Sequence, residues 1–172
     1  MKKCLIVLSF FLSALFVQSV YAQSDVSDKN YGFKISLGSS WTKSKTEETS
    51  NKDAISYTFD KKDGKDAIML LAFKVENVKS LEDMIYTLEK DVTLNIPKKS
   101  GDYSSVNNGD LEGKVALYKD SEFAEKIYFY RTKFVDGKQN YTYMLRFITS
   151  VPNYNTTTES EFTRIADTFR LN

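Results

Sequence analysis

The strongest constraint on the fold lies in residues 126–149, where two alternating apolar runs flank a tight-turn signal. The turn signal is Asp136-Gly137, because glycine accepts a positive φ and aspartate tolerates one. A two-residue loop at this position predicts an antiparallel hairpin in which Tyr130 lies opposite Tyr143. This register assigns every side chain of the hairpin to one of two faces.

The two faces of the predicted hairpin differ in chemistry. The face with Phe129 and Met144 is predicted to be core. Arg131 and Arg146 are its only groups that are expected to need contact with solvent. The other face is rich in tyrosine, and such rings either pack with their hydroxyl groups at the rim or, if exposed, stack against a ligand. Both interpretations remain open, so four residues are candidate contacts for a ligand or partner: Tyr128, Tyr130, Tyr141 and Tyr143.

The remaining periodicity combines strands with two helices. Alternation predicts strands at residues 31–37 and 55–59, and the apolar run at 67–73 predicts a central strand that is covered on both faces. Apolar spacings of three and four predict helices at residues 81–92 and 158–169, the second beginning with a Thr158–Glu161 capping box. These elements predict an α+β protein with a mainly antiparallel sheet and a helix on each face.

Residues 1–22 have the organisation of a secretory signal peptide. Two lysines precede an apolar stretch at residues 5–17, and Val20 and Ala22 are small enough to predict cleavage between Ala22 and Gln23. The apolar stretch is shorter than the roughly 20 residues that cross a bilayer, so we expect no membrane span after cleavage. The expected protein is bacterial and exported, either periplasmic or extracellular.

The segment that follows the predicted cleavage site divides into two parts. Residues 23–30 are polar and show no periodicity, which predicts a flexible leader. Residues 31–172 are expected to form a single domain with its own core.

The composition excludes several classes of catalytic and metal site. The chain contains no histidine, and its single cysteine, Cys4, lies inside the predicted signal peptide. A Ser-His-Asp or Cys-His site therefore cannot be built, and a zinc site would need carboxylates alone. The chain also has 24 basic and 23 acidic residues with the signs interspersed, which argues against nucleic acid as a partner. We expect no catalytic residue, no cofactor and no metal.

The order of these segments resembles the PsbP-like domains, a group that includes the DcrB-like periplasmic proteins of bacteria. The resemblance covers residues 31–171, although Gly38-Ser39-Ser40 stands where the family has a proline. It is carried by these positions: Tyr31, Gly32, Phe33, Trp41, Phe162, Ile165, Thr168 and Phe169. The resemblance implies a single α/β/α sandwich with a central, mainly antiparallel sheet of about six or seven strands.

Three functions remain open at this stage. The resemblance favours a non-catalytic binding or assembly module that contacts a protein or small ligand of the envelope. A carboxylate-based hydrolase of glycans or cell wall would need two carboxyl groups roughly 5–9.5 Å apart. A carrier of a small apolar ligand would need a cavity of roughly 300 Å³ or more, lined by residues such as Tyr128, Tyr130 and Tyr143.

Overall fold

A computed structural model of the chain describes residues 25–75, 80–133 and 138–172. The predicted signal peptide, its cleavage site and the Asp136-Gly137 turn lie outside the described residues.

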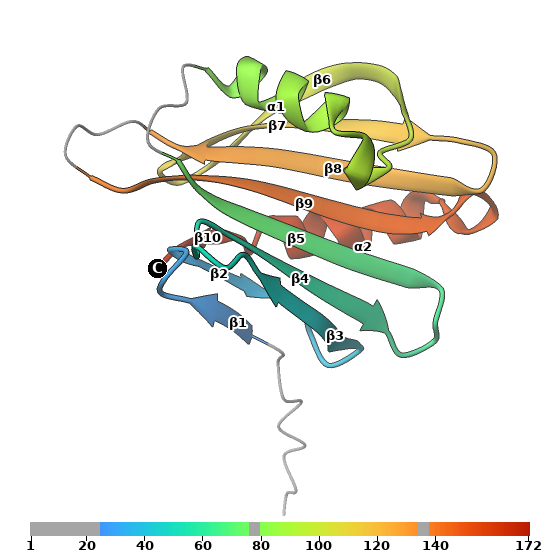
Figure 1. The fold of residues 1–172 in the computed structure, drawn as a ribbon. Coiled ribbons are helices and arrows are strands. Elements are labelled where there is room, and N and C mark those ends of the chain that lie inside the picture. Colours follow the sequence, from blue (N-terminus) through green and yellow to red (C-terminus); the bar gives the residue numbers. More distant parts are fainter. Residues whose placement is uncertain (1–24, 76–79, 134–137) are drawn as a thin grey trace, which may run out of the picture.

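The main element of the fold is a seven-stranded antiparallel sheet with the strand order β3-β4-β5-β9-β8-β7-β6 (Figure 1). Its strands are β3 (Trp41–Glu48), β4 (Ala54–Lys61), β5 (Asp66–Val75), β6 (Lys98–Asn108), β7 (Leu111–Lys119), β8 (Phe123–Thr132) and β9 (Asn140–Ser150). A three-stranded sheet consists of β1 (Asp25–Asp28), β2 (Phe33–Ser36) and β10 (Arg170–Leu171). The helices are α1 (Leu81–Lys90) and α2 (Thr156–Ala166), and the 3-10 turns are η1 (Val92–Leu94) and η2 (Val151–Asn153). The α+β prediction is confirmed.

The register of the β8–β9 hairpin is the predicted one. Tyr130 pairs with Tyr143, Phe129 with Met144, and Tyr128 with Leu145. The β5 strand lies between β4 and β9, as its uninterrupted apolar run predicted.

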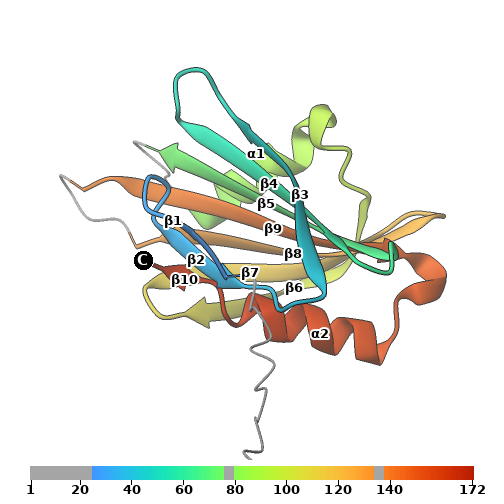
Figure 2. The same cartoon turned by 90° about the horizontal axis from the view of Figure 1, so that it is seen from below.

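The strand alternation divides the core into two clusters on opposite faces of the large sheet. The α1 face contains Phe129 and Met144, which pack with Leu81 and Ile85 of α1. The other face, here called the tyrosine face, is covered jointly by α2 and the three-stranded sheet (Figures 1 and 2). The two helices therefore lie against opposite faces of the sheet.

Aromatic rings fill the tyrosine face. The ring of Phe169 lies between three others, with centroid distances of 5.7 Å to Phe33, 5.4 Å to Tyr130 and 5.0 Å to Tyr143. The hydroxyl of Tyr143 donates a hydrogen bond of 2.9 Å to the carbonyl oxygen of Tyr31, so its buried polar group is satisfied. The segment before β10, the beginning of β2 and the β8–β9 hairpin thus share one packed core.

The structure differs from the sequence expectations at two strands. Asp25–Asp28, which we placed in a flexible leader, form β1: they pair with β2, and Asp28 accepts a 2.7 Å hydrogen bond from the hydroxyl of Tyr57. The polar stretch after residue 41 forms β3, whose side chains beyond Trp41 are exposed. Both strands lie at a sheet edge, where backbone pairing stabilises a strand that has no alternating apolar face.

The beginning of α2 also differs from the expectation. Its N-cap is Asn155, whose side-chain oxygen accepts hydrogen bonds from the backbone nitrogens of Thr157 and Thr158. The predicted cap at Thr158 is therefore wrong, because asparagine three residues earlier satisfies the free N–H groups of the first turn.

We expect Phe169→Ala to lower the free energy of unfolding by about 3–5 kcal/mol, because it leaves a cavity among three aromatic rings. The matched control is Phe123→Ala, since that ring is 45% exposed, and its cost should be below about 1 kcal/mol. Urea unfolding followed by circular dichroism measures both. Equal losses in the two variants would show that Phe169 is not a centre of the core.

Candidate functional site

A groove of about 790 Å³ lies between α1 and the β4–β5–β9 part of the large sheet. Its floor consists of half-buried apolar side chains together with Thr142: Ala54, Phe73, Val75, Met84 and Leu88. Its rim carries three exposed aspartates, Asp53, Asp83 and Asp91. We call this feature the α1 groove.

The α1 groove exists because one helix is too narrow for the sheet that it covers. A helix is about 10–12 Å across and neighbouring strands are about 4.8 Å apart, so one helix covers two or three strands. The buried residues of α1, Leu81 and Ile85, pack with Ile127 and Phe129 of β8. The apolar side chains of β5 that point to the same face, such as Phe73, are consequently covered along one side only.

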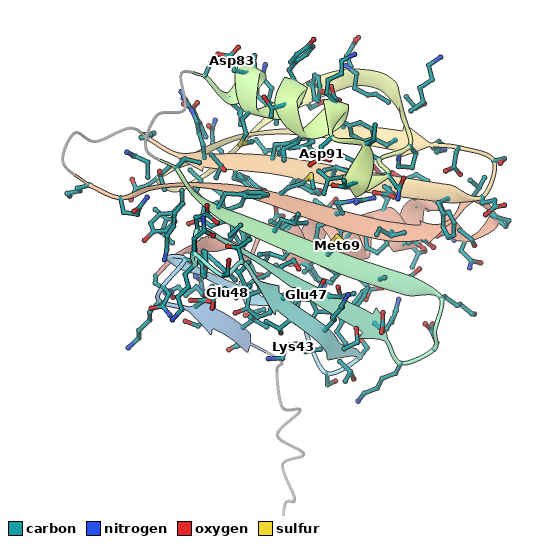
Figure 3. The ribbon with its side chains drawn as sticks, in the orientation of Figure 1. Lys43, Glu47, Glu48, Met69, Asp83 and Asp91 are labelled. Carbon is teal, nitrogen blue, oxygen red and sulfur yellow. The ribbon has the colours of Figure 1, made fainter. Side chains whose placement is uncertain are left out.

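One capping side chain fixes the beginning of α1, and another fixes the turn η1 that follows the helix. The Ser80 hydroxyl accepts a 3.0 Å hydrogen bond from the backbone nitrogen of Asp83, as the sequence suggests for a cap. At the other end, Asp91 caps η1 by accepting a 2.9 Å bond from the backbone nitrogen of Thr93. Asp83 and Asp91 therefore mark the two ends of the helix along the groove (Figure 3).

A carboxylate and two phenols anchor the C-terminal end of α1. Glu89 accepts hydrogen bonds from the hydroxyl of Tyr118, at 2.6 Å, and from the hydroxyl of Tyr103. Burial and the bond to Glu89 raise the pKa of Tyr103 to about 12, and the same causes raise the pKa of Tyr118. Both phenols are therefore neutral donors to the helix at physiological pH.

A buried ion pair holds η1, and with it the end of α1, against the sheet. The Arg146 guanidinium donates two hydrogen bonds of 2.8 Å to the carboxylate of Glu125, and a third of 2.7 Å to the carbonyl oxygen of Leu94 in η1. Arg146 is 5% exposed and Glu125 is 4% exposed. The expectation that Arg146 needs contact with solvent is wrong, because Glu125 and the carbonyl oxygen of Leu94 accept its hydrogen bonds in place of water.

The aspartates on the rim give the α1 groove a negative charge. Hydrogen bonds from Thr93 lower the pKa of Asp91, and hydrogen bonds from Thr49 and Asn51 lower the pKa of Asp53. Both carboxylates are therefore ionised at neutral pH. A general acid for glycoside hydrolysis needs the opposite shift, because it must carry a proton at the working pH.

Lys74 also lines the groove. The Lys74 ammonium donates a 2.9 Å hydrogen bond to the carbonyl oxygen of Lys52 and lies 4.6 Å from the centroid of the Tyr31 ring. Tyr31 belongs to the tyrosine face, so the Lys74 ammonium lies off the apolar floor, while its positive charge still lowers the pKa of Asp53 on the rim.

Three of the four tyrosines predicted as candidate contacts are inaccessible. Tyr128, Tyr130 and Tyr143 are 3%, 2% and 0% exposed within the core under α2 and β2. Tyr141 is half-buried and lines a smaller hollow of about 430 Å³, where Gly32 packs against its ring. In this structure the first three act as packing residues, and Tyr141 alone among the four reaches a hollow at the surface.

Sequence reasoning missed the residues of the α1 groove. Met84 and Leu88 belong to an apolar helical stripe, and Phe73 belongs to an apolar strand, so all three had the pattern of ordinary core residues. The available signal was the mismatch between a wide sheet and a single short helix on one of its faces.

The described residues contain neither a metal cluster nor a spanning helix. Within the ranges 25–75, 80–133 and 138–172, no group of three or more histidine, cysteine, aspartate or glutamate side chains could hold a metal ion. None of the helices in these ranges is long and apolar enough to cross a membrane.

Comparisons with known proteins give a likeness of fold. No family model matches the chain, and no curated protein matches it. The structure of LpqN, a protein involved in cell envelope biogenesis of Mycobacterium tuberculosis, aligns with a TM-score of 0.51 at 13% identity, covering 87% of this chain and 90% of LpqN. A structure from Bacteroides thetaiotaomicron aligns with a TM-score of 0.49 at 13% identity and covers 86% of this chain. The chain spans about half of that protein, because the alignment covers 48% of it.

We expect Arg146→Met to lower the free energy of unfolding by about 3–5 kcal/mol, because it leaves the Glu125 carboxylate buried without a partner. The double variant Glu125→Leu/Arg146→Met should recover most of this loss, since it removes both buried charges. Urea unfolding of the two variants and of Lys45→Met, in the exposed pair of Lys45 with Glu47, measures the difference. A loss as small as that of Lys45→Met would contradict the account of the buried pair.

Proposed function

We propose that the chain is an exported, non-catalytic binding or assembly module of the PsbP-like kind, with an α/β/α sandwich fold. Its working surface is the α1 groove, and its partner is a protein of the bacterial envelope. The signal peptide, the periplasmic or extracellular location and the partner are parts of this proposal.

The observation that carries the proposal is the open apolar floor of the α1 groove. Phe73, Met84 and Leu88 remain half-buried after the chain has folded, although burial of apolar surface is the main driving force of folding. An apolar hollow of several hundred Å³ bordered by a few polar groups is the usual form of a binding site. A bound partner would bury the apolar side chains of the groove that α1 leaves partly exposed.

The likeness to LpqN supports the envelope context. LpqN is involved in cell envelope biogenesis, and the two folds align over nearly the whole of both chains. The same context follows from the predicted signal peptide, which would bring the chain into the envelope. Since the identity is 13%, the LpqN likeness supports the choice of compartment and supplies no binding residue.

The contacts favour a binding module over the two alternatives. The hydrolase alternative needs a carboxyl group with a raised pKa, whereas the pKa values of Asp53 and Asp91 are lowered. The carrier alternative needs a cavity lined by Tyr128, Tyr130 and Tyr143, but Phe169 and its neighbours fill the space between these rings and the covering layer.

A photoreactive amino acid at position 87 tests this function in the native envelope. Thr87 is exposed and lines the α1 groove, so the full exported chain should form a specific crosslinked adduct there on illumination. The matched control is position 123, where Phe123 is 45% exposed at the beginning of β8, away from the groove, and little adduct should form. Immunoblotting and mass spectrometry of the envelope fraction measure both.

Two results would contradict the proposed function. Adducts of equal yield at positions 87 and 123 would show that the groove is not the contact surface. Turnover of a cell-wall glycan that Asp53→Asn or Asp91→Asn abolishes would show that the protein is an enzyme.

A further inference from the structure

We propose that the α1 groove binds an extended peptide segment of its partner in which lysine or arginine residues flank an apolar residue. This inference rests on the proposed function, because it states what the binding surface holds.

The floor of the groove suits an apolar side chain. Met84 and Leu88 are one helical turn apart on α1 and face the groove together, while Phe73 approaches from β5. An unbranched methionine adapts its shape to different ligands, and an aromatic ring provides a large flat surface. The three side chains therefore offer a contact for one aliphatic or aromatic residue of a ligand.

The carboxylates of the rim are spaced for an extended chain. Asp83 and Asp91 are eight positions apart, which corresponds to about 12 Å along a helix at 1.5 Å per residue. An extended peptide advances about 3.3 Å per residue and covers this distance in about four residues. Asp53, next to β4, supplies a third carboxylate from the sheet side of the groove. Two cationic side chains about four residues apart could thus meet opposite ends of α1.

The charges that border the groove favour a cationic ligand. The lining carries three carboxylates and the ammonium of Lys74, which also lowers the pKa of Asp53, so the charge that borders the groove is negative on balance. The ammonium of Lys90 lies 5.6 Å from the ring of Tyr86, which is 64% exposed. Each carboxylate has about four acceptor positions, so the bonds that Asp91 accepts from Thr93 leave it capacity for a ligand. An acidic peptide or an anionic headgroup would meet like charges instead.

Strand pairing limits how a peptide can be held. The β5 strand, which forms the floor, pairs with β4 on one side and β9 on the other. A peptide therefore cannot add to the sheet as a further strand at this site, and its side chains must supply the recognition. This requirement makes the charges and the apolar anchor of the ligand decisive.

Fluorescence anisotropy with three labelled peptides tests the inference on the purified chain without its signal peptide. The probe GSSKSLSKSSG carries two lysines four residues apart with a leucine between them. The first comparison peptide replaces both lysines with glutamate, and the second replaces the leucine with serine. We expect the probe to bind at low salt and each comparison peptide to bind at least about tenfold more weakly, because each lacks one of the two recognised features.

A matched pair of double variants assigns the binding to the groove. Asp83→Asn/Asp91→Asn should weaken the probe about fivefold, since each exposed ion pair contributes modestly. Asparagine at position 91 retains a side-chain oxygen for Thr93, so the fold should be kept, which circular dichroism checks. Glu47→Gln/Asp102→Asn removes the same charge from the exposed edge strands β3 and β6, and its affinity should stay within about twofold.

Each contrary outcome has a definite meaning. Equal binding of the glutamate peptide, or equal weakening by Glu47→Gln/Asp102→Asn, would overturn the cationic segment. Absence of peptide binding while the crosslink at position 87 persists would overturn this inference and leave the proposed function standing. Absence of both would overturn the two together. Sedimentation velocity that shows a dimer abolished by Asp83→Asn/Asp91→Asn would identify a second copy of the chain as the occupant.

Discussion

The antiparallel pairing of β9 with β5 on one side and β8 on the other determines how the rest of the molecule is arranged. Because side chains alternate along each strand, this pairing sends Tyr128, Tyr130 and Tyr143 to one face and Phe129 and Met144 to the other. A slip of one residue would exchange the two sets. The register therefore decides which face becomes a closed aromatic core and which one receives α1.

The two faces are covered to different extents. The tyrosine face is covered by α2 and the three-stranded sheet (Figure 2). The rings of Tyr128, Tyr130 and Tyr143 are buried beneath this cover. The other face has the ten-residue helix α1, followed by η1 and pinned by the Arg146–Glu125 pair and by Glu89. These anchors hold α1 over β8, and the apolar side chains of β5 remain open beside it. The open surface is thus a consequence of where the helix is fixed.

The sequence predicted the parts of the fold that follow local patterns. The β8–β9 register followed from Asp136-Gly137, and α1 followed from its apolar stripe. The exposed edge strands β1 and β3 were missed, because edge pairing leaves no apolar alternation in the sequence. The α1 groove was not predicted, because its lining residues have the pattern of core residues and its depth depends on how tertiary packing places α1 relative to β5. The four candidate tyrosines were chosen by residue type, and type does not distinguish a buried ring from an exposed one.

We expect the α1 groove to be occupied by a partner when the protein is in its own environment. The chain has no cysteine after position 4, so a single cysteine reports on one surface without interference. The most direct measurement compares how fast a membrane-impermeant maleimide labels Thr87→Cys in the intact envelope and in the purified protein, with Phe123→Cys as the reference. We expect labelling at position 87 to be slowed severalfold in the envelope and labelling at position 123 to be unchanged. Equal labelling at position 87 in the two settings would contradict this expectation.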